Sequence, residues 1–419
     1  MEVREASVKY LDIAKYRDSE IGLIPQDWEV ITLASRASIQ SGIAKNANAT
    51  FRDPVAVPYL RVANVQDGYL DLEEVSSINI ERTDLSRYAV LPGDVLMNEG
   101  GDLDKLGRGA LWRGQISPCV HQNHVFVVRC KDGLVPEYLS AWTSSAQARR
   151  YFMLAGRQTT NLASMNKTSL GELTVAVPAT DDEQYEIANA LTDADALIDS
   201  LEQLLTKKRQ IKQGAMQELL TGKRRLPGHG GVWSERSLVD IATCLDNLRR
   251  PLNEAQRSTM RGEFPYCGAN GVVDYIDRYC IDDAVILIAE DGGYFDEYLT
   301  RPIAYQMSGK FWVNNHAHVL KAKDDFDQEF LFYALVHKNI LSFLASGTRA
   351  KLNRSELNKI IVRAPEQQDE QSAIAAVLTE MDTEITVLES RLTKARALKQ
   401  AMAQALLTGR IRLVEPARS

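Results

Sequence analysis

The feature that most constrains this chain is an internal repeat. Residues 183–226 recur at 370–413 without a gap, at an offset of 187 residues (370 minus 183). Roughly half of the aligned positions are identical, as expected of a duplicated structural unit. Leu219-Leu220-Thr221-Gly222, for example, recurs as Leu406-Leu407-Thr408-Gly409. The chain is therefore two copies of one design, and a protein of that kind suits a target made of two parts.

Length and composition limit the class of protein. With 419 residues, 45% of them apolar and 25% charged, the chain exceeds the usual domain size of about 100–200 residues, so we expect more than one domain. We expect no membrane span, because no apolar run reaches about 18 residues. The charged stretch 1–18 lacks the apolar segment of a secretory signal. Five cysteines without disulfide or CxxC spacing favour a reduced, cytoplasmic protein.

Each copy of the repeat carries the pattern of a long helix. In the second copy, apolar residues alternate at spacings of four and three, which is a heptad seam interrupted by Lys399. In the first copy, Lys208 and Lys212 occupy two seam positions, so the seam weakens there or shifts to Leu204 and Ile211. The residues that we expect to bury the seam are Ile187, Leu191, Ile198, Leu201, Leu205, Ile374, Leu378, Ile385, Leu388 and Leu392.

A single helix with such a stripe could equally lie in a globular core. Two long matching stripes in one chain favour an intramolecular coiled coil, because each can bury its seam against the other. If a two-fold axis relates the copies, the helices are antiparallel. About 39 residues at a rise of 1.5 Å would give a rod of roughly 58 Å.

Between the rods, short β-type runs alternate with turn residues, as in Ala284–Ala289 followed by Gly292-Gly293. We therefore expect two α/β (α+β) globular domains joined by two long antiparallel coiled-coil helices. The expected segments are an N-terminal extension (1–24), a first domain (25–180), the first helix (181–224), a linker (225–232), a second domain (233–366), the second helix (367–410) and a tail (411–419).

Two windows of the acidic chain, 149–171 and 338–355, contain Lys and Arg residues but no Asp or Glu. The net charge of −7 argues weakly against nucleic-acid binding over the whole surface, yet it allows a local basic face. Lys and Arg suit phosphates, while Asn, Gln and Arg can bind base edges. The alternative is a solvated surface. The candidate DNA-binding residues are Arg149, Arg150, Arg157, Gln158, Asn161, Lys167, Asn270, Lys338, Arg349, Lys351, Asn353 and Arg354.

Two further patterns invite a chemical interpretation. The histidine pairs His121/His124 and His316/His318 suggest a metal site, but satisfied structural or polar-contact histidines fit better, because further ligands are missing. An acid followed by Gly-Gly, at 99–101 and again at 290–293, reads most simply as a turn. It could also be a catalytic turn, or a loop presenting acceptors to cytosine amino groups.

Signatures of catalysis are missing. The chain has no phosphate loop, no dinucleotide-binding GxGxxG, no Asn-Pro-Pro-aromatic motif and no convincing nucleophile signature. We therefore expect no catalytic residue, no metal ligand and no cofactor in this chain. Two alternatives remain: a coiled-coil adaptor whose domains bind proteins rather than DNA, and an enzyme with an unrecognised site.

The arrangement resembles the specificity subunit of Type I restriction–modification enzymes. The resemblance covers nearly the whole chain and rests on the order of two variable domains and two repeated rods. Short sequence motifs support the resemblance. They are Ile24-Pro25-Gln26-Asp27-Trp28, Leu91-Pro92-Gly93-Asp94-Val95-Leu96, Tyr266-Cys267-Gly268-Ala269-Asn270-Gly271 and the Leu-Leu-Thr-Gly ends of the rods. Cys267 departs from the family motif, where glycine is common.

The resemblance implies a non-catalytic, double-stranded DNA-binding subunit with two target recognition domains, each for one half of a split, asymmetric sequence. It implies that the rods set the spacing between the half-sites and dock two methyltransferase (modification) subunits, which hold S-adenosylmethionine and methylate adenine. Restriction subunits that use ATP and Mg²⁺ would join that core in phage defence. Catalysis would then lie in the partner subunits.

Overall fold

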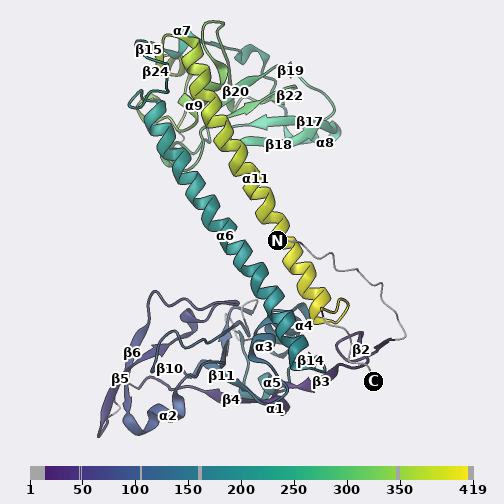
Figure 1. Cartoon of the computed structure of the whole chain (residues 1–419). Helices are drawn as coiled ribbons and strands as arrows, with labels where there is room; N and C mark the ends of the chain where they lie inside the picture. The colour runs from purple at the N-terminus through teal and green to yellow at the C-terminus, as the bar shows by residue number, and fades with distance from the viewer. Residues whose placement is uncertain are drawn as a thin grey trace. The chain divides into compact units, whose positions relative to one another are not determined.

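The protein forms two compact units, each of which combines a globular domain with parts of both long helices (Figure 1). This computed structural model describes residues 15–46, 48, 50–103, 106–158, 163–345 and 350–413. Unit 1 comprises residues 1–201 and 391–419, and unit 2 comprises residues 202–390. The long helices are α6 (Asp181–Leu219) and α11 (Gln368–Leu407). The expected α/β domains and long helices are confirmed, but each compact unit contains a portion of both helices.

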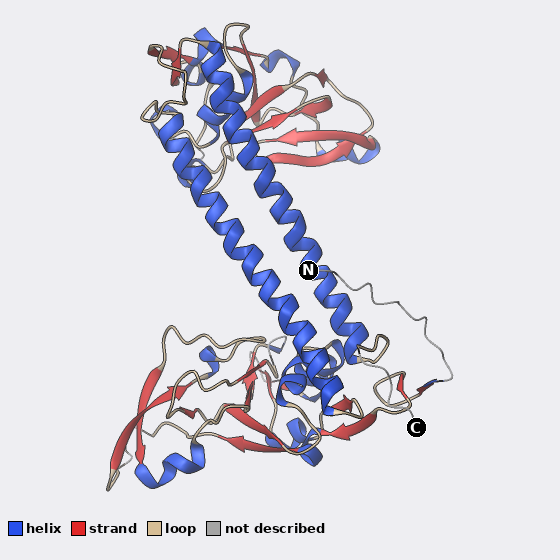
Figure 2. Ribbon diagram, viewed as in Figure 1, coloured by secondary structure: helices blue, strands red, loops and turns tan. Residues whose placement is uncertain are grey.

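The domain of unit 1 is built on small, mostly antiparallel sheets (Figure 2). Its central sheet has the order β4-β11-β7-β9, with bounds Ala37–Ser41, Val125–Cys130, Val95–Asn98 and Gly109–Leu111. A second sheet, β10-β5-β6, comprises Val120–His121, Pro54–Leu60 and Ser76–Glu81. A third, β12-β13-β8, comprises Arg157–Gln158, Ala163–Ser164 and Gly100–Gly101. Two pairs complete the set: β1 (Tyr16–Arg17) with β2 (Ile24–Pro25), and β3 (Glu29–Thr32) with β14 (Thr174–Val177).

Short helices accompany these sheets, and two of them begin at a side-chain cap. The helices are α1 (Leu33–Arg36), α2 (Leu85–Tyr88), α3 (Pro136–Thr143), α4 (Ala146–Ala155) and α5 (Lys167–Gly171). Ser145 caps α4 by accepting a hydrogen bond from the backbone of Ala148, and Asn166 caps α5 in the same way. All four residues of β7 are buried; three are apolar, and the fourth, Asn98, donates its side-chain amide to the carbonyl of Val65 at 2.8 Å.

The domain of unit 2 repeats this plan with different details. Its central sheet is β16-β23-β20-β21, with bounds Ala242–Cys244, Ala317–Ala322, Val285–Ala289 and Ala304–Met307. A second sheet, β18-β17-β22-β19, comprises Gly271–Ile276, Arg261–Gly268, Lys310–Val313 and Ile281–Asp282. Strands β15 (Trp233–Ser237) and β24 (Ile361–Pro365) pair separately. The helices of the domain are α7 (Leu238–Ile241), α8 (Glu254–Thr259), α9 (Gln328–Val336) and α10 (Arg354–Leu357).

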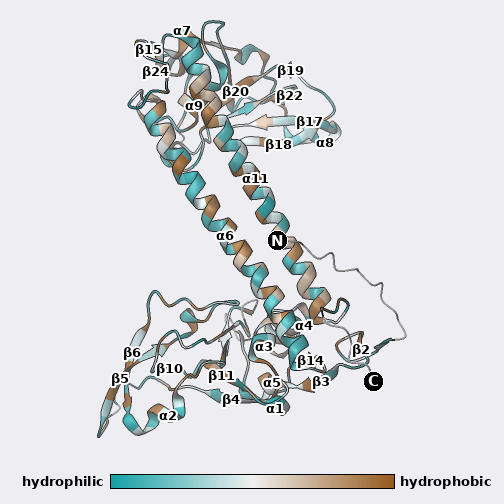
Figure 3. Ribbon diagram, viewed as in Figure 1, coloured by the Kyte–Doolittle hydropathy of each residue, from teal (hydrophilic) through white to brown (hydrophobic). Residues whose placement is uncertain are grey.

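The predicted seam is buried on both long helices, where hydrophobic positions recur between hydrophilic ones (Figure 3). Nine of its ten residues are at most 9% exposed, and Leu201 is half-buried. The seam residues nearest each domain belong to that domain's own hydrophobic core: Ile187 and Leu191 in unit 1, and Ile374 and Leu378 in unit 2. The ends of α6 and α11 therefore belong to the domain cores. The helical turns between these ends form the seam between the two helices.

The suggested shift of the first seam to Leu204 and Ile211 is wrong. These side chains are 41% and 48% exposed. The seam keeps its register instead, because Lys208 and Lys212 bond across to Glu384 and Asp382, each at 2.5 Å. A lysine at a seam position buries its aliphatic stem while its ammonium group reaches a partner at the edge.

The two units contain the same ion pairs. In unit 2, Lys212 pairs with Asp382 and Arg225 pairs with Glu370; in unit 1, the partners are Lys399 with Asp195 and Arg412 with Glu183. Every residue in one unit is the 187-residue equivalent of its counterpart in the other. In both units, residues later in one helix pair with residues earlier in the other, so the helices are antiparallel, as predicted.

A tryptophan lies against the arginine of each arginine–glutamate ion pair, near the C-terminal end of each long helix. Arg225 lies over the ring of Trp233 at 5.6 Å, and Arg412 lies over Trp28 at 5.7 Å. Each arginine follows a glycine with positive φ, Gly222 or Gly409, which ends the helix. A Cβ on Gly409 would lie 2.3 Å from Pro25, so only glycine fits this approach. Across the described residues, no helix has the length and apolar character needed to cross a membrane.

Candidate nucleic-acid interface

In the first domain, part of the basic window forms two paired strands, one of which also pairs with the Gly-Gly turn. Strand β13 pairs on one side with β12, which begins at Arg157, and on the other with Gly100-Gly101. The backbone N–H of Met165 donates to the carbonyl of Glu99 at 2.8 Å. Two sequence patterns that lie about 60 residues apart therefore form one surface.

The second domain makes the same connection. The N–H of Leu352, the 187-residue equivalent of Met165, donates to the carbonyl of Glu290 at 2.7 Å. Asp291 and Lys351 form an isolated antiparallel bridge, which joins the acid-Gly-Gly turn to the basic window. Asn270 reaches the same turn, where its side-chain amide donates to the carbonyl of Gly292 at 2.9 Å.

One histidine from each pair completes these surfaces. Nδ1 of His124 lies 2.8 Å from Oε2 of Glu99, and Nδ1 of His316 lies 2.6 Å from Oδ1 of Asp291. Both imidazoles are open to solvent, with side chains 56% and 48% exposed. The acid-Gly-Gly turns are therefore more than chain reversals, because each presents a carboxylate–histidine pair beside a basic segment.

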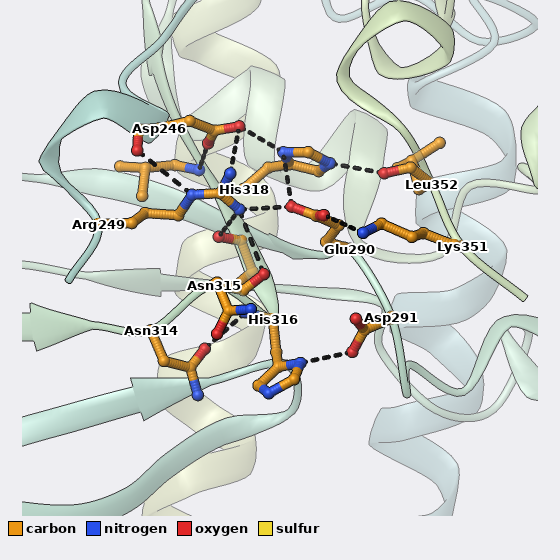
Figure 4. Close-up of polar contacts among 12 residues, drawn as sticks. Asp246, Arg249, Glu290, Asp291, Asn314, Asn315, His316, His318, Lys351 and Leu352 are labelled. Carbon is orange, nitrogen blue, oxygen red and sulfur yellow. Dashed lines mark hydrogen bonds and ion pairs between the residues drawn. The ribbon is translucent and has the colours of Figure 1, made fainter. Parts of the chain in front are cut away.

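The other two histidines are buried: His318 is bonded through both ring nitrogens, whereas Nε2 of His121 has no hydrogen-bond partner among the described residues. Nδ1 of His121 bonds to the carbonyl of Val125 at 2.7 Å, and burial lowers the pKa of this imidazole. His318 uses both ring nitrogens: Nδ1 contacts Asp246 and Nε2 contacts the carbonyl of Leu352, each at 2.7 Å (Figure 4). A carbonyl and a carboxylate both accept hydrogen bonds, so each ring nitrogen of His318 must carry a proton. His318 is therefore a cation.

His318 belongs to a buried ionic cluster behind the surface of the second domain. Arg249 bonds to Glu290 at 2.5 Å and to Asp246 at 3.1 Å, and Lys351 reaches Glu290 at 2.9 Å (Figure 4). Burial alone would lower the pKa of His318, but the bonds to Asp246, Cys244 and Leu352 outweigh it and raise the value to about 9. Burial alone would raise the pKa of Glu290, but Arg249 and Lys351 lower it.

Cys244, Asp246 and His318 also bring ligand atoms within 4.8 Å of one another. A bound cation would have to displace a proton from His318 and lie beside the guanidinium of Arg249, which contacts the same carboxylate. The bonding around this group fits an ion-pair cluster better than a metal site. The cluster holds Leu352 and Lys351 in place within the basic window 338–355.

The predicted residues of the first domain divide into exposed and paired groups. Arg150, Arg157 and Lys167 are exposed. Arg149 forms an ion pair with Asp67, which reduces the charge that it offers to a ligand. Lys167 begins α5 and lines a shallow depression of about 510 Å³. Gln158 lies in β12, and Asn161 lies outside the described residues.

In the second domain, Lys351, Asn353 and Arg354 follow one another on the exposed side of the same segment. Asn353 occupies the N-cap position of α10, and Arg354 is its first residue. Lys338 does not join them: it is half-buried after α9, and burial lowers its pKa, opposed by the charge of Glu235 on β15. Arg349 lies outside the described residues.

The sequence interpretation did not single out Arg249 and Asp246, and it did not join His124 or His316 to the acids. One signal was available: Glu99 and His124 are 25 residues apart, and so are Asp291 and His316. Arg249 and Asp246 lie in a region without an echo in the first domain, so their role needed coordinates.

Comparison with known families decides how this surface is interpreted. The family model of the Type I restriction modification DNA specificity domain matches residues 25–213 and again residues 231–395. The chain belongs to this family. It is a Type I restriction–modification specificity subunit, a non-catalytic component that recognises the DNA target within the complex.

Curated relatives agree with the assignment. A putative MjaX specificity subunit from Methanocaldococcus jannaschii is 24% identical over 433 aligned residues, which cover 95% of this chain and 97% of the relative. A putative specificity subunit from Haemophilus influenzae is 36% identical over 143 residues, which cover 34% of this chain and 35% of that protein. The EcoKI specificity subunit of Escherichia coli is 24% identical over 166 residues, or 39% of this chain and 35% of its own length.

Solved structures show the same fold. The S subunit of the Type I system from M. genitalium matches with a TM-score of 0.62 at 14% identity, covering 90% of this chain and 96% of that one. A chain from a structural study of complex assembly and conformational transition in the Type I system matches with a TM-score of 0.53 at 13% identity, covering 93% and 99%. The specificity subunit thus shares its fold with these chains at low sequence identity.

Proposed function

We propose that this specificity subunit binds a bipartite, asymmetric double-stranded DNA target, with one recognition domain for each half-site. The observation that carries the proposal is the repeated surface: in both domains a basic segment hydrogen-bonds to an acid-Gly-Gly turn, through the equivalent N–H groups of Met165 and Leu352. Exposed Arg157 and Lys167 in one domain, and Arg354 in the other, offer charge to phosphates.

The two surfaces differ in their side chains while their backbone connections agree. Arg157 begins β12 in the first domain, whereas Lys351, tied to Glu290, adjoins the turn of the second. Different side chains on a common frame would give each half-site its own sequence, because base edges are distinguished by side-chain donors and acceptors. This difference supports an asymmetric target.

The long helices would carry the partner subunits. The resemblance suggests two methyltransferase subunits docked on the coiled coil, and restriction subunits in the full complex. Both units expose large apolar side chains on the helices: Tyr185, Leu197 and Leu398 in unit 1, and Leu204, Ile211 and Val387 in unit 2. Exposed apolar positions beside a complete seam support a protein-binding role for the rods.

In this assignment the partner subunits hold the cofactors: S-adenosylmethionine in the methyltransferases, and ATP with Mg²⁺ in the restriction subunits. The rods would also set the distance between the half-sites. We place the assembled complex in the cytoplasm of a bacterium or archaeon, where it would act in phage defence.

The test is to co-express the subunit with its methyltransferase partner and to sequence the modified bases of a plasmid. A split adenine-methylated motif with a fixed spacer is expected. An uninterrupted motif would contradict the two-domain assignment. If the purified complex neither methylates nor shifts DNA, the two domains bind something else, as in the protein-adaptor alternative.

A further inference from the structure

The carboxylate–histidine pairs occupy the same place in both domains. The N–H of Glu99 donates to the carbonyl of His124 at 2.9 Å, and the N–H of Glu290 donates to the carbonyl of His316 at 2.9 Å. Both contacts close the open end of the two central strands of the main sheet, β7 with β11 and β20 with β23. The position of the histidine is thus fixed by the frame of the sheet.

The acid is placed differently in the two domains. In the first, Glu99 itself binds the histidine, whereas its backbone equivalent Glu290 turns into the ionic cluster with Arg249. The histidine partner in the second domain is the next residue, Asp291 (Figure 4). The same pairing is therefore reached with a different acid from a neighbouring position.

Structural stability gives little reason for these pairs. Each lies at the surface, where an ion pair contributes little because water competes for both groups. The backbone bonds of Glu99 and Glu290 hold the two strand ends without help from the imidazoles. Their exposure beside the basic segments points to contact with a ligand.

The hydrogen bonds also orient the rings. In the neutral ring, with Nδ1–H donating to the carboxylate, Nε2 carries a lone pair. The amide of Asn123 lies 3.2 Å from Nε2 of His124, as expected for a donor to that lone pair. In Figure 4 the second ring nitrogen of His316 points away from Asp291, and no described residue is recorded in hydrogen-bond contact with it. Each pair presents acceptors next to a cationic segment: a carboxylate in both domains, and also Nε2 of His316 in the second.

We propose that Glu99–His124 and Asp291–His316 contact base edges, one pair in each half-site of the DNA target. The inference rests on the proposed function and adds the residues that distinguish bases. Acceptors of this kind fit the exocyclic amino groups of cytosine or adenine in the major groove. The flanking basic residues would bind phosphates and hold each pair in register.

The experiment compares His124→Ala and His316→Ala with His229→Ala, a control in the linker between rod and second domain. Each full-length variant is co-expressed with the methyltransferase partner, and the modified bases are sequenced. His124→Ala should relax one position in one half-site, and His316→Ala one position in the other, each with about a 10-fold loss of discrimination. His229→Ala should leave both half-sites unchanged.

Two results would overturn the inference while the wild-type motif remains split: both half-sites keep their discrimination in the variants, or affinity falls equally for all sequences with a shallower salt dependence, as for a phosphate contact. If an alanine variant loses methylation altogether, the corresponding His→Gln variant decides by the same criteria, a relaxed half-site supporting the inference and an unchanged one overturning it. A wild-type motif that is not split would instead overturn the proposed function and this inference with it.

Discussion

Arg412 and Glu183, 229 residues apart in sequence, form a two-point ion pair in which Nη2 lies 2.6 Å from Oε2 and Nε contacts Oε1. The carboxylate of Glu183 is 2% exposed, and Arg412 also contacts Asp27. The same pair recurs in unit 2 as Arg225 with Glu370. The chain therefore locks the end of one long helix to the start of the other at both domains.

Replacing Arg412 with alanine should destabilise unit 1 by about 3 kcal/mol, because Glu183 would remain buried without a counter-charge. Thermal or urea unfolding of the full-length chain measures the change. Arg410→Ala, at an exposed position two residues earlier, is the matched control and should change the stability little. Equal effects of the two substitutions would show that the pair contributes nothing specific.

The seam predicts a second contrast. Leu378→Ala should cost about 3 kcal/mol, because its side chain is fully buried in the core of unit 2 and its loss leaves a cavity. Leu204→Ala, at a position 41% exposed, should cost less than about 0.5 kcal/mol. If Leu204→Ala were the more damaging variant in the isolated chain, the register of the seam would be wrong.

The sequence predicts the rods well and the exact contacts at their edges less well. Heptad spacing identifies Ile374, Leu378 and the other seam residues, because burial of a helix face follows from periodicity alone. It could not decide whether Lys212 stays in register, since that depends on Asp382 from the other helix. A lysine at a seam position looks like a break until its partner is known.

The same limit applies to the candidate site. Charge patterning identified Arg157 and Lys351, and the local residues identified the histidines and the Gly-Gly turns. The sequence could not show that these segments lie together in space, because their contact depends on pairing between strands that are remote in sequence, such as Gly101 with Ala163. It also gave Lys338 the same weight as Lys351, although the fold half-buries Lys338 after α9.

His318 predicts a stability profile with a defined sign. Its pKa rises from 6.5 to about 9 on folding, so the folded state holds its proton more tightly. The resulting stability is fully present below pH 6.5 and is lost as the pH rises through about 9, by an amount on the order of 3 kcal/mol. Unfolding of unit 2 measured between pH 6.5 and 9 checks this.

His318→Gln should remove most of that pH dependence and lower the stability at pH 6.5. The effect of the buried thiol Cys267 can be distinguished from that of His318. Burial raises the pKa of Cys267 from 9 to about 12, so its contribution to stability declines only above pH 9. A wild-type profile that is flat between pH 6.5 and 9 would show that His318 is not the cation that the cluster requires.

Arg157 should act through phosphate. Arg157→Ala in the complex with methyltransferase should weaken DNA binding for specific and nonspecific sequences alike, and should reduce the salt slope of binding by about 1. Arg113→Ala, at an exposed position in the loop after β9, is the control. Unchanged affinity and an unchanged slope for Arg157→Ala would remove this residue from the interface.

The central claim is that each recognition domain binds one half-site, and exchange of one domain tests it most directly. Residues 233–366 are replaced by the corresponding domain of a relative with a different target, both rods being kept, and the modified bases are sequenced with the same methyltransferase partner. The account predicts a new sequence in one half of the motif, with the other half unchanged. A change in both halves, or in neither while methylation persists, would contradict it.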